Sequence, residues 1–342
     1  MSSTERAEAP PPAMALMQLL FGKQLTFSLS GLARLGIADH MDGVPKPVEE
    51  IAAKAGAHAP SLYRVMRMLA SFGVFREEEP RRFALTPIGA LLKSDAPESM
   101  RYTAMMLGDE FATRAYEHIA TCLRTGTDGV TQAYGKPVWE VLAERPSQCE
   151  TFQNAMTQSS GRVAKAVVEA YDFAGIERVA DVGGGHGSLL GSILVANPRM
   201  QGVLFDRPEV IASVSKDQFA GCEDRVAFEA GSFFERVPDG CDAYLMKHII
   251  HDWSDAHCRT ILDLMRAKLP PQGRVLLCEL VVTGEKGPTP AKLLDIEMLV
   301  VTEGGKERTE KEFAQLLAAA GFKLRRVIPT KVPTSIVEAE PV

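Results

Sequence analysis

The sequence lacks any close pair of cysteines. Its 342 residues hold six cysteines, spread singly along the chain: Cys122, Cys149, Cys222, Cys241, Cys258 and Cys278. The absence of a C-x-x-C pair argues against a zinc site and against a disulfide framework. We therefore expect reduced, partly buried thiols in a cytoplasmic protein.

Long apolar runs are also missing. The apolar stretch 13–21 is interrupted by Gln18, and it is far shorter than the roughly 18 residues that a membrane span needs. Residues 1–12 are polar and then proline-rich, without the basic and apolar regions of a signal peptide. We expect no signal peptide, no membrane association and a cytoplasmic location.

An excess of positive charge is absent as well. The formal net charge is −6, which argues against a nucleic-acid coat or a membrane-surface binder. The chain is 46% hydrophobic, so it can bury a full core. At about 100–200 residues per domain, its length suits two domains.

The first hundred residues predict a helix-turn-helix followed by a hairpin wing. Ser61 is a candidate N-cap for the second helix, and Gly73 is a candidate end. The elements that we expect are helices over 13–40, 47–55 and 62–72 and strands over 74–76 and 82–85.

Such a module either binds DNA or serves as a dimerisation platform. Residues 1–100 hold 11 Lys and Arg and 11 Asp and Glu, so their net charge is 11 − 11 = 0. A DNA-binding domain is usually strongly basic, and the wing tip here carries Glu77, Glu78 and Glu79. These charges favour the dimerisation platform.

Residues 97–160 read as helices that connect this module to the rest of the chain. We expect a helix from Pro97 to Gly108, further helices over 111–123 and from 138 onward, a loop over 128–137, and a long helix over 152–171. Methionines are frequent here, and Met suits both a core and a pocket for a flat apolar ligand.

From residue 176 onward, strands and helices alternate, which predicts a mostly parallel, seven-stranded, Rossmann-like sheet. The expected strands are 179–182, 203–206, 226–230, 243–247, 274–281, 322–328 and 334–339; the expected helices are 188–196, 209–220, 255–269, 291–301 and 310–320. Thr309 and Glu312 form a capping box for the last helix. A ligand should lie at the carboxyl ends of the parallel strands.

A glycine-rich turn follows the first of these strands. Gly183, Gly185 and Gly187 allow a tight turn and a close approach of the backbone to a ligand. Asp206 ends the next strand about 20 positions later, where an acid holds the ribose hydroxyls of an adenine nucleoside.

The turn is compatible with a dinucleotide, with S-adenosylmethionine (SAM) or with no ligand. Asp181 lies two residues before the first glycine, where its charge would oppose a phosphate but favour a cationic amino-acid group. The third glycine of a dinucleotide site is missing at its usual spacing. These two features favour SAM.

The polar run from Lys247 to Asp255 lies at the end of another strand. Trp253 offers an aromatic face, Lys247 can order a cofactor, and His251 is the candidate general base, because its ordinary pKa is near neutrality. Glu279 or Glu307 can hold the imidazole in one tautomer. Two alternatives remain open: a loop histidine without catalytic role, or a metal site built from His248, His251, Asp252, Asp255 and His257.

Five segments in order resemble the SAM-dependent O-methyltransferases of the plant caffeic-acid and isoflavone type, including their bacterial relatives and the acetylserotonin methyltransferases. The segments are 181–185, 205–208, 231–234, 247–255 and 304–313. The resemblance covers nearly the whole chain. It implies a winged-helix dimerisation domain (1–100), a helical connector lining the substrate pocket (101–160) and a catalytic domain (161–342).

The resemblance also implies roles for individual residues. His251 would deprotonate a phenolic or catecholic hydroxyl of a small aromatic substrate, flanked by Glu279 and Glu307. No metal is needed, the product is S-adenosylhomocysteine, and the homodimer forms through the N-terminal domain. The implied SAM-binding residues are Asp181, Gly183, Gly185, Asp206, Arg207, Ser232, Phe233, Lys247, His248, Asp252 and Trp253. The expected substrate pocket comprises Met105, Met106, Phe152, Met156, Met298 and Thr302.

One position departs from the family pattern. Ser232 stands where plant members have the aspartate that accepts from the adenine amine. A hydroxyl still accepts, but charged acceptors bind roughly twice as strongly. Two other functions stay open at this point: a relative diverted to decarboxylation or hydroxylation, and a SAM-binding winged-helix regulator.

Overall fold

The computed structural model describes residues 10–342. The chain divides into two compact units: Met1–Glu110 with Glu150–Ala155, and Phe111–Cys149 with Met156–Val342. This division splits the connector expected over 101–160 between the two units. The three-part domain boundaries stay a prediction.

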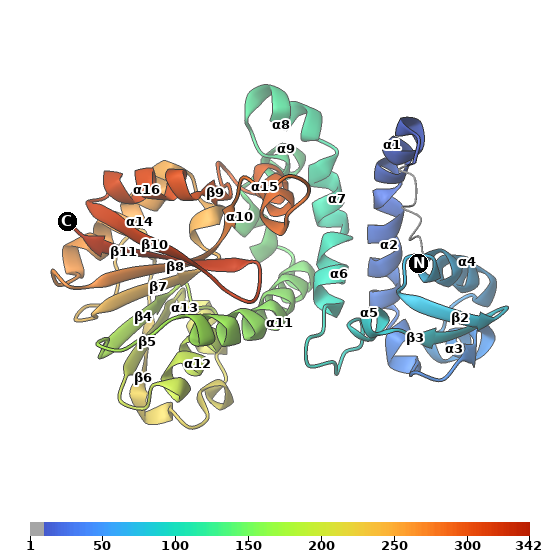
Figure 1. Cartoon of the computed structure of the whole chain (residues 1–342), viewed down its shortest axis with the longest axis horizontal. Helices are drawn as coiled ribbons and strands as arrows, with labels where there is room; N and C mark the ends of the chain where they lie inside the picture. The colour runs from blue at the N-terminus through green and yellow to red at the C-terminus, as the bar shows by residue number, and fades with distance from the viewer. Residues whose placement is uncertain (1–9) are drawn as a thin grey trace, which may run out of the picture. The chain divides into compact units, whose positions relative to one another are not determined.

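The first unit is mainly helical (Figure 1). Its elements are α1 (Pro12–Leu20), α2 (Gly22–Arg34), η1 (Ile37–His40), β1 (Lys46–Pro47), α3 (Val48–Ala55), α4 (Ala59–Ala70), β2 (Phe75–Glu79), β3 (Arg82–Leu85), α5 (Pro87–Ala90) and α6 (Arg101–Leu107). The strands form a sheet in the order β1-β3-β2. Two helices followed by a hairpin agree with the prediction for this segment, and Ile51, Met66, Leu69 and Phe83 are fully buried between them.

Three expectations for this unit were wrong in detail. The helix expected over 13–40 is broken at Phe21 and again at Gly36, whose positive φ of 62° ends α2. Ser61 lies inside α4, and His58 is the N-cap residue. The helix expected from Pro97 begins only at Arg101, so the proline lies outside it.

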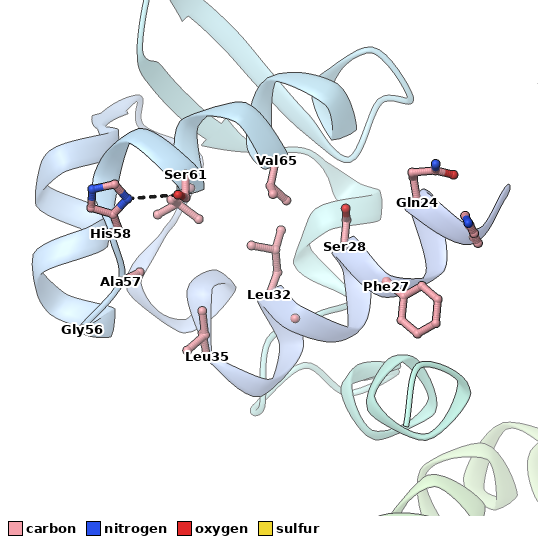
Figure 2. A pocket seen from close by; sticks show the side chains of 13 residues that line it. Gln24, Phe27, Ser28, Leu32, Leu35, Gly56, Ala57, His58, Ser61 and Val65 are labelled. Carbon is pink, nitrogen blue, oxygen red and sulfur yellow. Dashed lines mark hydrogen bonds between the residues drawn. The ribbon is translucent and has the colours of Figure 1, made fainter. Parts of the chain in front are cut away.

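A groove lies between α2 and the start of α4. Its volume is about 770 Å³, and its apolar lining includes Phe27 and Leu32 of α2, Leu35 just after α2, and Val65 of α4 (Figure 2). The apolar side chains of α1 are exposed as well, with Leu19 at 78%. This unit therefore presents a broad apolar face.

Short helices begin the second unit. They are α7 (Glu110–Tyr116), α8 (Ile119–Thr125), α9 (Gly129–Tyr134) and α10 (Val138–Ala143). The long α11 (Pro146–Ala170) follows, and its segment Glu150–Ala155 belongs to the first unit. The loop expected over 128–137 is in fact mostly helical, because Asp128 acts as an N-cap and accepts a hydrogen bond from the backbone N–H of Thr131 at 2.7 Å. The long helix also starts six residues earlier than expected, with Pro146 in its first turn.

The sheet of the second unit contains all seven expected strands. They are β4 (Arg178–Val182), β5 (Gln201–Asp206), β6 (Val226–Ala230), β7 (Ala243–Lys247), β8 (Arg274–Val282), β10 (Phe322–Pro329) and β11 (Thr334–Pro341), in the order β10-β11-β8-β7-β4-β5-β6. Strands β4 to β8 pair in parallel, whereas β11 is antiparallel to both neighbours. The two-residue β9 (Arg308–Thr309) adds to β8.

Helices cover both faces of this sheet (Figure 1). They include α12 (Ser188–Ala196), α13 (Pro208–Ser213), α14 (Asp255–Lys268), α15 (Pro290–Val301) and α16 (Glu310–Ala319), with 3-10 turns η2 (Lys216–Phe219), η3 (Glu223–Arg225) and η4 (Ile250–Asp252). Side chains alternate along the strands: Tyr244 and Met246 pack with α14 and α16, while Leu245 packs with α11 and α12. The helix expected over 209–220 was wrong as one element, since Val214 is extended between α13 and η2.

The strand order places a crevice beside β4. From β4 the chain moves outward to β5 and β6, then returns to the opposite side of β4 with β7. Ligands of open parallel sheets bind where the order reverses in this way.

None of the described helices is both long enough and apolar enough to cross a membrane.

Candidate active site

The glycine turn after β4 is held against the end of β5. The backbone N–H of Gly185 donates to Oδ2 of Asp206 at 2.8 Å, and Oδ1 of Asp206 accepts from the N–H of Arg207 at 2.7 Å. Gly183 and Gly185 both have positive φ values, 72° and 57°. A Cβ at Gly185 would meet no described atom within 4 Å, so there is room for a ligand beside the turn.

Asp181 ends up buried without a partner. It is 1% exposed, and neither carboxylate oxygen has a hydrogen-bond partner among the described residues. Burial raises the pKa of Asp181 to about 7, and the nearby charge of Lys247 opposes the rise. An unpaired buried carboxylate is costly. A cationic ligand at this turn would offset that cost.

Lys247 and Phe233 each lie close to the segment 181–183. Burial lowers the pKa of Lys247, and Asp181 opposes that effect. The ring of Phe233 packs against Phe234 and Trp253, at centroid distances of 4.9 and 6.1 Å, and its Cε1 lies 3.5 Å from where a Cβ of Gly183 would be. The aromatic cluster thus reaches the glycine turn, where an adenine can stack.

Three predicted cofactor residues make other contacts. Nε2 of His248 lies 3.0 Å from Oγ1 of Thr334 on β11. The exposed guanidinium of Arg207 pairs with Glu209 at 3.2 Å. The hydroxyl of Ser232 accepts from the N–H of Phe234 at 3.2 Å, which closes a local turn.

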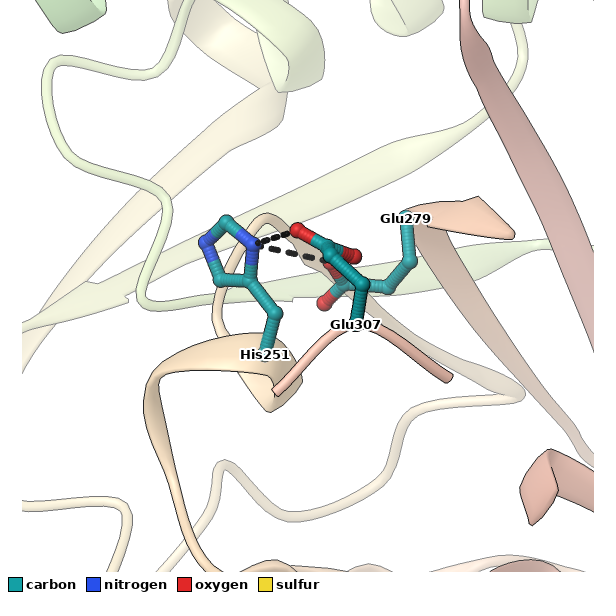
Figure 3. Close-up of side chains that lie close together, drawn as sticks. All are labelled: His251, Glu279 and Glu307. Atoms are coloured by element: carbon teal, nitrogen blue, oxygen red, sulfur yellow. Dashed lines mark hydrogen bonds and ion pairs between the residues drawn. The ribbon is translucent and has the colours of Figure 1, made fainter. Parts of the chain in front are cut away.

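His251, Glu279 and Glu307 come together although they are far apart in the sequence (Figure 3). Nδ1 of His251 lies 2.7 Å from Oε1 of Glu307 and 3.9 Å from Oε2 of Glu279. All three are buried, at 8%, 0% and 4% exposure. Because Nδ1–H donates to Glu307, the lone pair of a neutral ring lies on Nε2. That nitrogen is 3.5 Å from Oδ1 of Asp252.

Glu279 has a second task that the sequence did not reveal. Its Oε1 accepts from two successive backbone N–H groups, those of Ile249 at 3.1 Å and Ile250 at 2.9 Å. The turn that presents them depends on His248, a non-glycine residue with φ of 52°. Glu279 therefore anchors the segment that carries His251.

Three carboxyl groups surround the imidazole of His251. Burial by itself would lower the pKa of His251, but Asp252, Glu279 and Glu307 raise it to about 10. Burial raises the pKa of Glu279, and His251 opposes the rise. The surrounding carboxyl groups therefore favour the protonated form of the imidazole.

The metal site expected as an alternative, from His248, His251, Asp252, Asp255 and His257, does not assemble. Among the described residues, the one set close enough to hold an ion is His251, Glu279 and Glu307, within 4.8 Å. His248 contacts Thr334, and His257 contacts Ser254 through Nδ1 at 3.1 Å. Carboxylates that flank an imidazole in this way also serve to orient a base.

The predicted substrate residues fall into both units. Met105, Met106 and Phe152 belong to the first unit, and Met156, Met298 and Thr302 to the second. Met298 and Thr302 are buried at the end of α15, where the Thr302 hydroxyl donates to the carbonyl of Met298 at 2.8 Å. A common substrate pocket stays a prediction.

A small crevice borders the His251 segment on the other side. It has a volume of about 30 Å³, and its lining includes Trp139, Asp252, Trp253 and Thr302. The two indole rings are 6.4 Å apart at 32°. Asp252 therefore borders both this crevice and the imidazole of His251.

Family models match most of the chain, and the chain belongs to the O-methyltransferase family. Residues 116–323 match an O-methyltransferase domain, and residues 17–95 match an O-methyltransferase dimerisation domain. The protein is therefore an O-methyltransferase, and its cofactor is SAM. The orphaned Asp181 and the open space beside Gly185 fit that cofactor.

Particular relatives cover nearly the whole chain. The phenazine O-methyltransferase PhzM of Lysobacter antibioticus is 42% identical over 100% of both chains. The 3-amino-4-hydroxybenzoate 4-O-methyltransferase of Streptomyces cremeus is 35% identical, over 95% of this chain and 89% of the relative. The crystal structure of CalO1, a methyltransferase in calicheamicin biosynthesis, in its SAH-bound form matches with a TM-score of 0.86 and 33% identity, over 96% and 98% of the two chains.

Sequence reasoning missed two polar residues beside the cluster. Asp295 accepts from the backbone N–H of Glu307 at 2.9 Å, and Arg308 is among the largest fully buried side chains. The only available signal was a basic residue directly after Glu307. The burial of Arg308 depends on contacts with residues 250–255, about fifty positions earlier in the chain.

Proposed function

We propose that this protein methylates a hydroxyl group of a small aromatic molecule, with His251 as the general base. The observation that carries the proposal is the 2.7 Å contact between Nδ1 of His251 and Glu307, which leaves Nε2 to accept a proton. The phenazine and hydroxybenzoate relatives act on aromatic substrates by name, which supports the same substrate class here.

The proposed reaction is a direct displacement. SAM, when bound, supplies an electrophilic methyl group and is converted to S-adenosylhomocysteine. Nε2 of His251 takes the proton of the acceptor hydroxyl while the oxygen forms its bond to the methyl carbon. Most of the acceleration comes from alignment of the reacting atoms, and base catalysis adds roughly 10²–10⁴-fold.

We propose Asp181, Gly183, Gly185, Asp206, Phe233 and Lys247 as the principal SAM-binding residues. Asp206 has lone pairs left for ribose hydroxyls, although it already accepts from Gly185 and Arg207. Trp253 belongs to the aromatic cluster around Phe233. Ser232 is proposed as a weaker acceptor for the adenine amine, and Arg207, His248 and Asp252 as peripheral to the cofactor.

The acceptor pocket is proposed to use Met105, Met106, Phe152, Met156, Met298 and Thr302, an apolar set suited to a flat ring. We also propose a homodimer formed through the first unit. The dimerisation-domain match over 17–95 and the exposed apolar residues of α1, such as Leu19 and Leu20, support it. The cytoplasm is the proposed location.

The test is methyl transfer by the purified protein to a panel of phenols, catechols and phenazines, followed by mass spectrometry. We expect a product heavier by one methylene and a His251→Ala variant that still binds SAM but turns over roughly 10²–10⁴-fold more slowly. His118→Ala, which alters a half-buried histidine at the start of α8, is the matched control. Turnover by His251→Ala at the wild-type rate contradicts the proposed base.

A further inference from the structure

The side chain of Arg308 is buried with all its donors in use. It is 1% exposed. Nε donates to Oδ1 of Asp255 at 3.0 Å, and Nη2 donates to the same oxygen at 2.7 Å and to the carbonyl of Trp253 at 3.0 Å. Nη1 donates to the carbonyls of Ile250 at 2.9 Å and Lys306 at 3.3 Å. These contacts account for the five N–H groups of a guanidinium.

The two carbonyls that share Nη1 have special positions in the chain. Ile250 directly precedes His251, and Lys306 directly precedes Glu307. Nη1 of Arg308 therefore links the carbonyl group just before His251 to the carbonyl group just before Glu307. The contact to Trp253 holds the same loop two residues beyond His251.

The backbone supports this junction directly. The N–H of Lys306 donates to the carbonyl of His251 at 2.9 Å. A Cβ at Gly305 would lie 2.5 Å from that carbonyl oxygen and 2.8 Å from the carbonyl carbon of Asp252, so the two segments touch. Nζ of Lys306 also donates to Oδ2 of Asp255 at 3.0 Å. This ion pair is a further contact between the segment before Glu307 and the segment after His251.

A purely structural role does not require an arginine here. The carboxylate partner, Asp255, has a side chain that is 57% exposed, so the ion pair itself adds little to stability. A buried ion pair can often be replaced as a whole by apolar side chains of similar volume without loss of stability, although removing only one partner is costly. What a planar guanidinium adds is direction, because its rigid fork aims each N–H at one acceptor.

We propose that Arg308 is a positioning residue for methyl transfer, which sets the placement of His251 relative to Glu307 by joining the carbonyls of Ile250 and Lys306. This inference rests on the proposed function of His251 as the base. Arg308 does not touch the imidazole, so it acts through the backbone of the two segments.

The experiment compares Arg308→Lys with wild type and with Arg266→Lys. Arg266 also donates to backbone carbonyls, those of Gly321 and Val342, but far along α14 from His251. For Arg308→Lys we expect a kcat about 10- to 100-fold lower, with the KM and Kd of SAM unchanged. The low-field NMR signal of the His251 Nδ1 proton should shift or broaden. Arg266→Lys should keep both the wild-type kcat and the signal.

The same variants in a His251→Gln background separate the two proposals. If Arg308 acts through His251, Arg308→Lys lowers kcat no further in that background. An equal further loss overturns the positioning role, as does a folded Arg308→Lys with wild-type kcat, pH profile and NMR signal. A His251→Gln single variant with wild-type kcat instead overturns the base itself.

A second variant covers the case in which Arg308→Lys does not fold. Asp255→Ala removes two of the five contacts and leaves the three carbonyl contacts of the guanidinium. We expect it to fold with reduced stability, because the buried guanidinium loses its carboxylate but keeps its three carbonyl acceptors, and to lower kcat to a smaller extent. Unchanged kcat together with an unchanged Nδ1 signal in this variant counts against the proposal.

Discussion

Nδ1 of His251 and Oε1 of Glu307 lie 2.7 Å apart in a buried contact between residues 56 positions apart in the sequence. In the neutral ring, a carboxylate at this distance favours the tautomer with its proton on Nδ1. The two flanking acids have different partners. Glu307 contacts the imidazole ring, whereas Glu279 accepts hydrogen bonds from the backbone N–H groups of Ile249 and Ile250.

Replacement of Glu307 by Gln should therefore impair the base more than it impairs the fold. The amide can present its NH₂ group to Nδ1, which would favour the tautomer with its proton on Nε2. We expect kcat to fall by roughly 10²-fold or more, with SAM affinity unchanged by calorimetry. Glu310→Gln, an exposed change in the first turn of α16, is the control. A normal kcat for Glu307→Gln would show that the tautomer does not matter.

The protonation of His251 should depend on the charge of the bound cofactor. The carboxylates raise its pKa to about 10 in the free protein, which favours the protonated ring, whereas only the neutral ring can act as the base. A nearby sulfonium disfavours a second positive charge. We expect the pKa of His251, followed by NMR, to be lower in the SAM complex than in the S-adenosylhomocysteine complex, which lacks that charge. Equal pKa values in both complexes would contradict this coupling.

Asp181 should make the stability of the cofactor-free protein decrease as the pH rises. Its pKa is raised from 3.8 to about 7, so the folded chain holds this proton more tightly than the unfolded chain. The resulting stabilisation is complete below about pH 3.8 and is lost as the pH rises through about 7. His251 acts in the same direction at higher pH, from about 6.5 to about 10.

The measurement is thermal unfolding between pH 5 and pH 8.5, with and without SAM. Asp181→Asn should flatten the pH dependence between pH 5 and about pH 7 in the cofactor-free protein, because the amide does not titrate. It should also weaken SAM binding, since an amide carries no charge for the ammonium group. If the wild-type and variant curves remain parallel, Asp181 does not titrate in this range.

Gly183→Ala should cost more stability than glycine replacement alone explains. The new Cβ would lie 2.8 Å from Cδ1 of Ile249, at a position with φ of 72°. The matched control is Gly175→Ala, where φ is 83° and no described atom lies within 4 Å of the new Cβ. The left-handed backbone alone costs about 1–2 kcal/mol in both. Denaturant unfolding should give a larger loss for Gly183→Ala, and equal losses would mean that Ile249 moves aside freely.

The sequence predicted local features well where they depend on short-range patterns. The alternation of apolar strands and helices located all seven main strands, and the Thr309–Glu312 capping box is present. Boundaries failed where one side chain or one backbone angle decides the outcome. Asp128 begins a helix in an expected loop, and Gly36 ends α2 inside an expected helix.

The sequence by itself also determined the family, the cofactor and the choice of His251, Glu279 and Glu307 as partners. It left open which acid bonds the imidazole, because Glu279 and Glu307 are equivalent as residue types. Only the tertiary structure decided this, by placing Glu307 2.7 Å and Glu279 3.9 Å from Nδ1. The physical reason is that these distances depend on how β8 and the segment before β9 pack against η4. The junction at Arg308 likewise exists only once segments about fifty residues apart lie side by side.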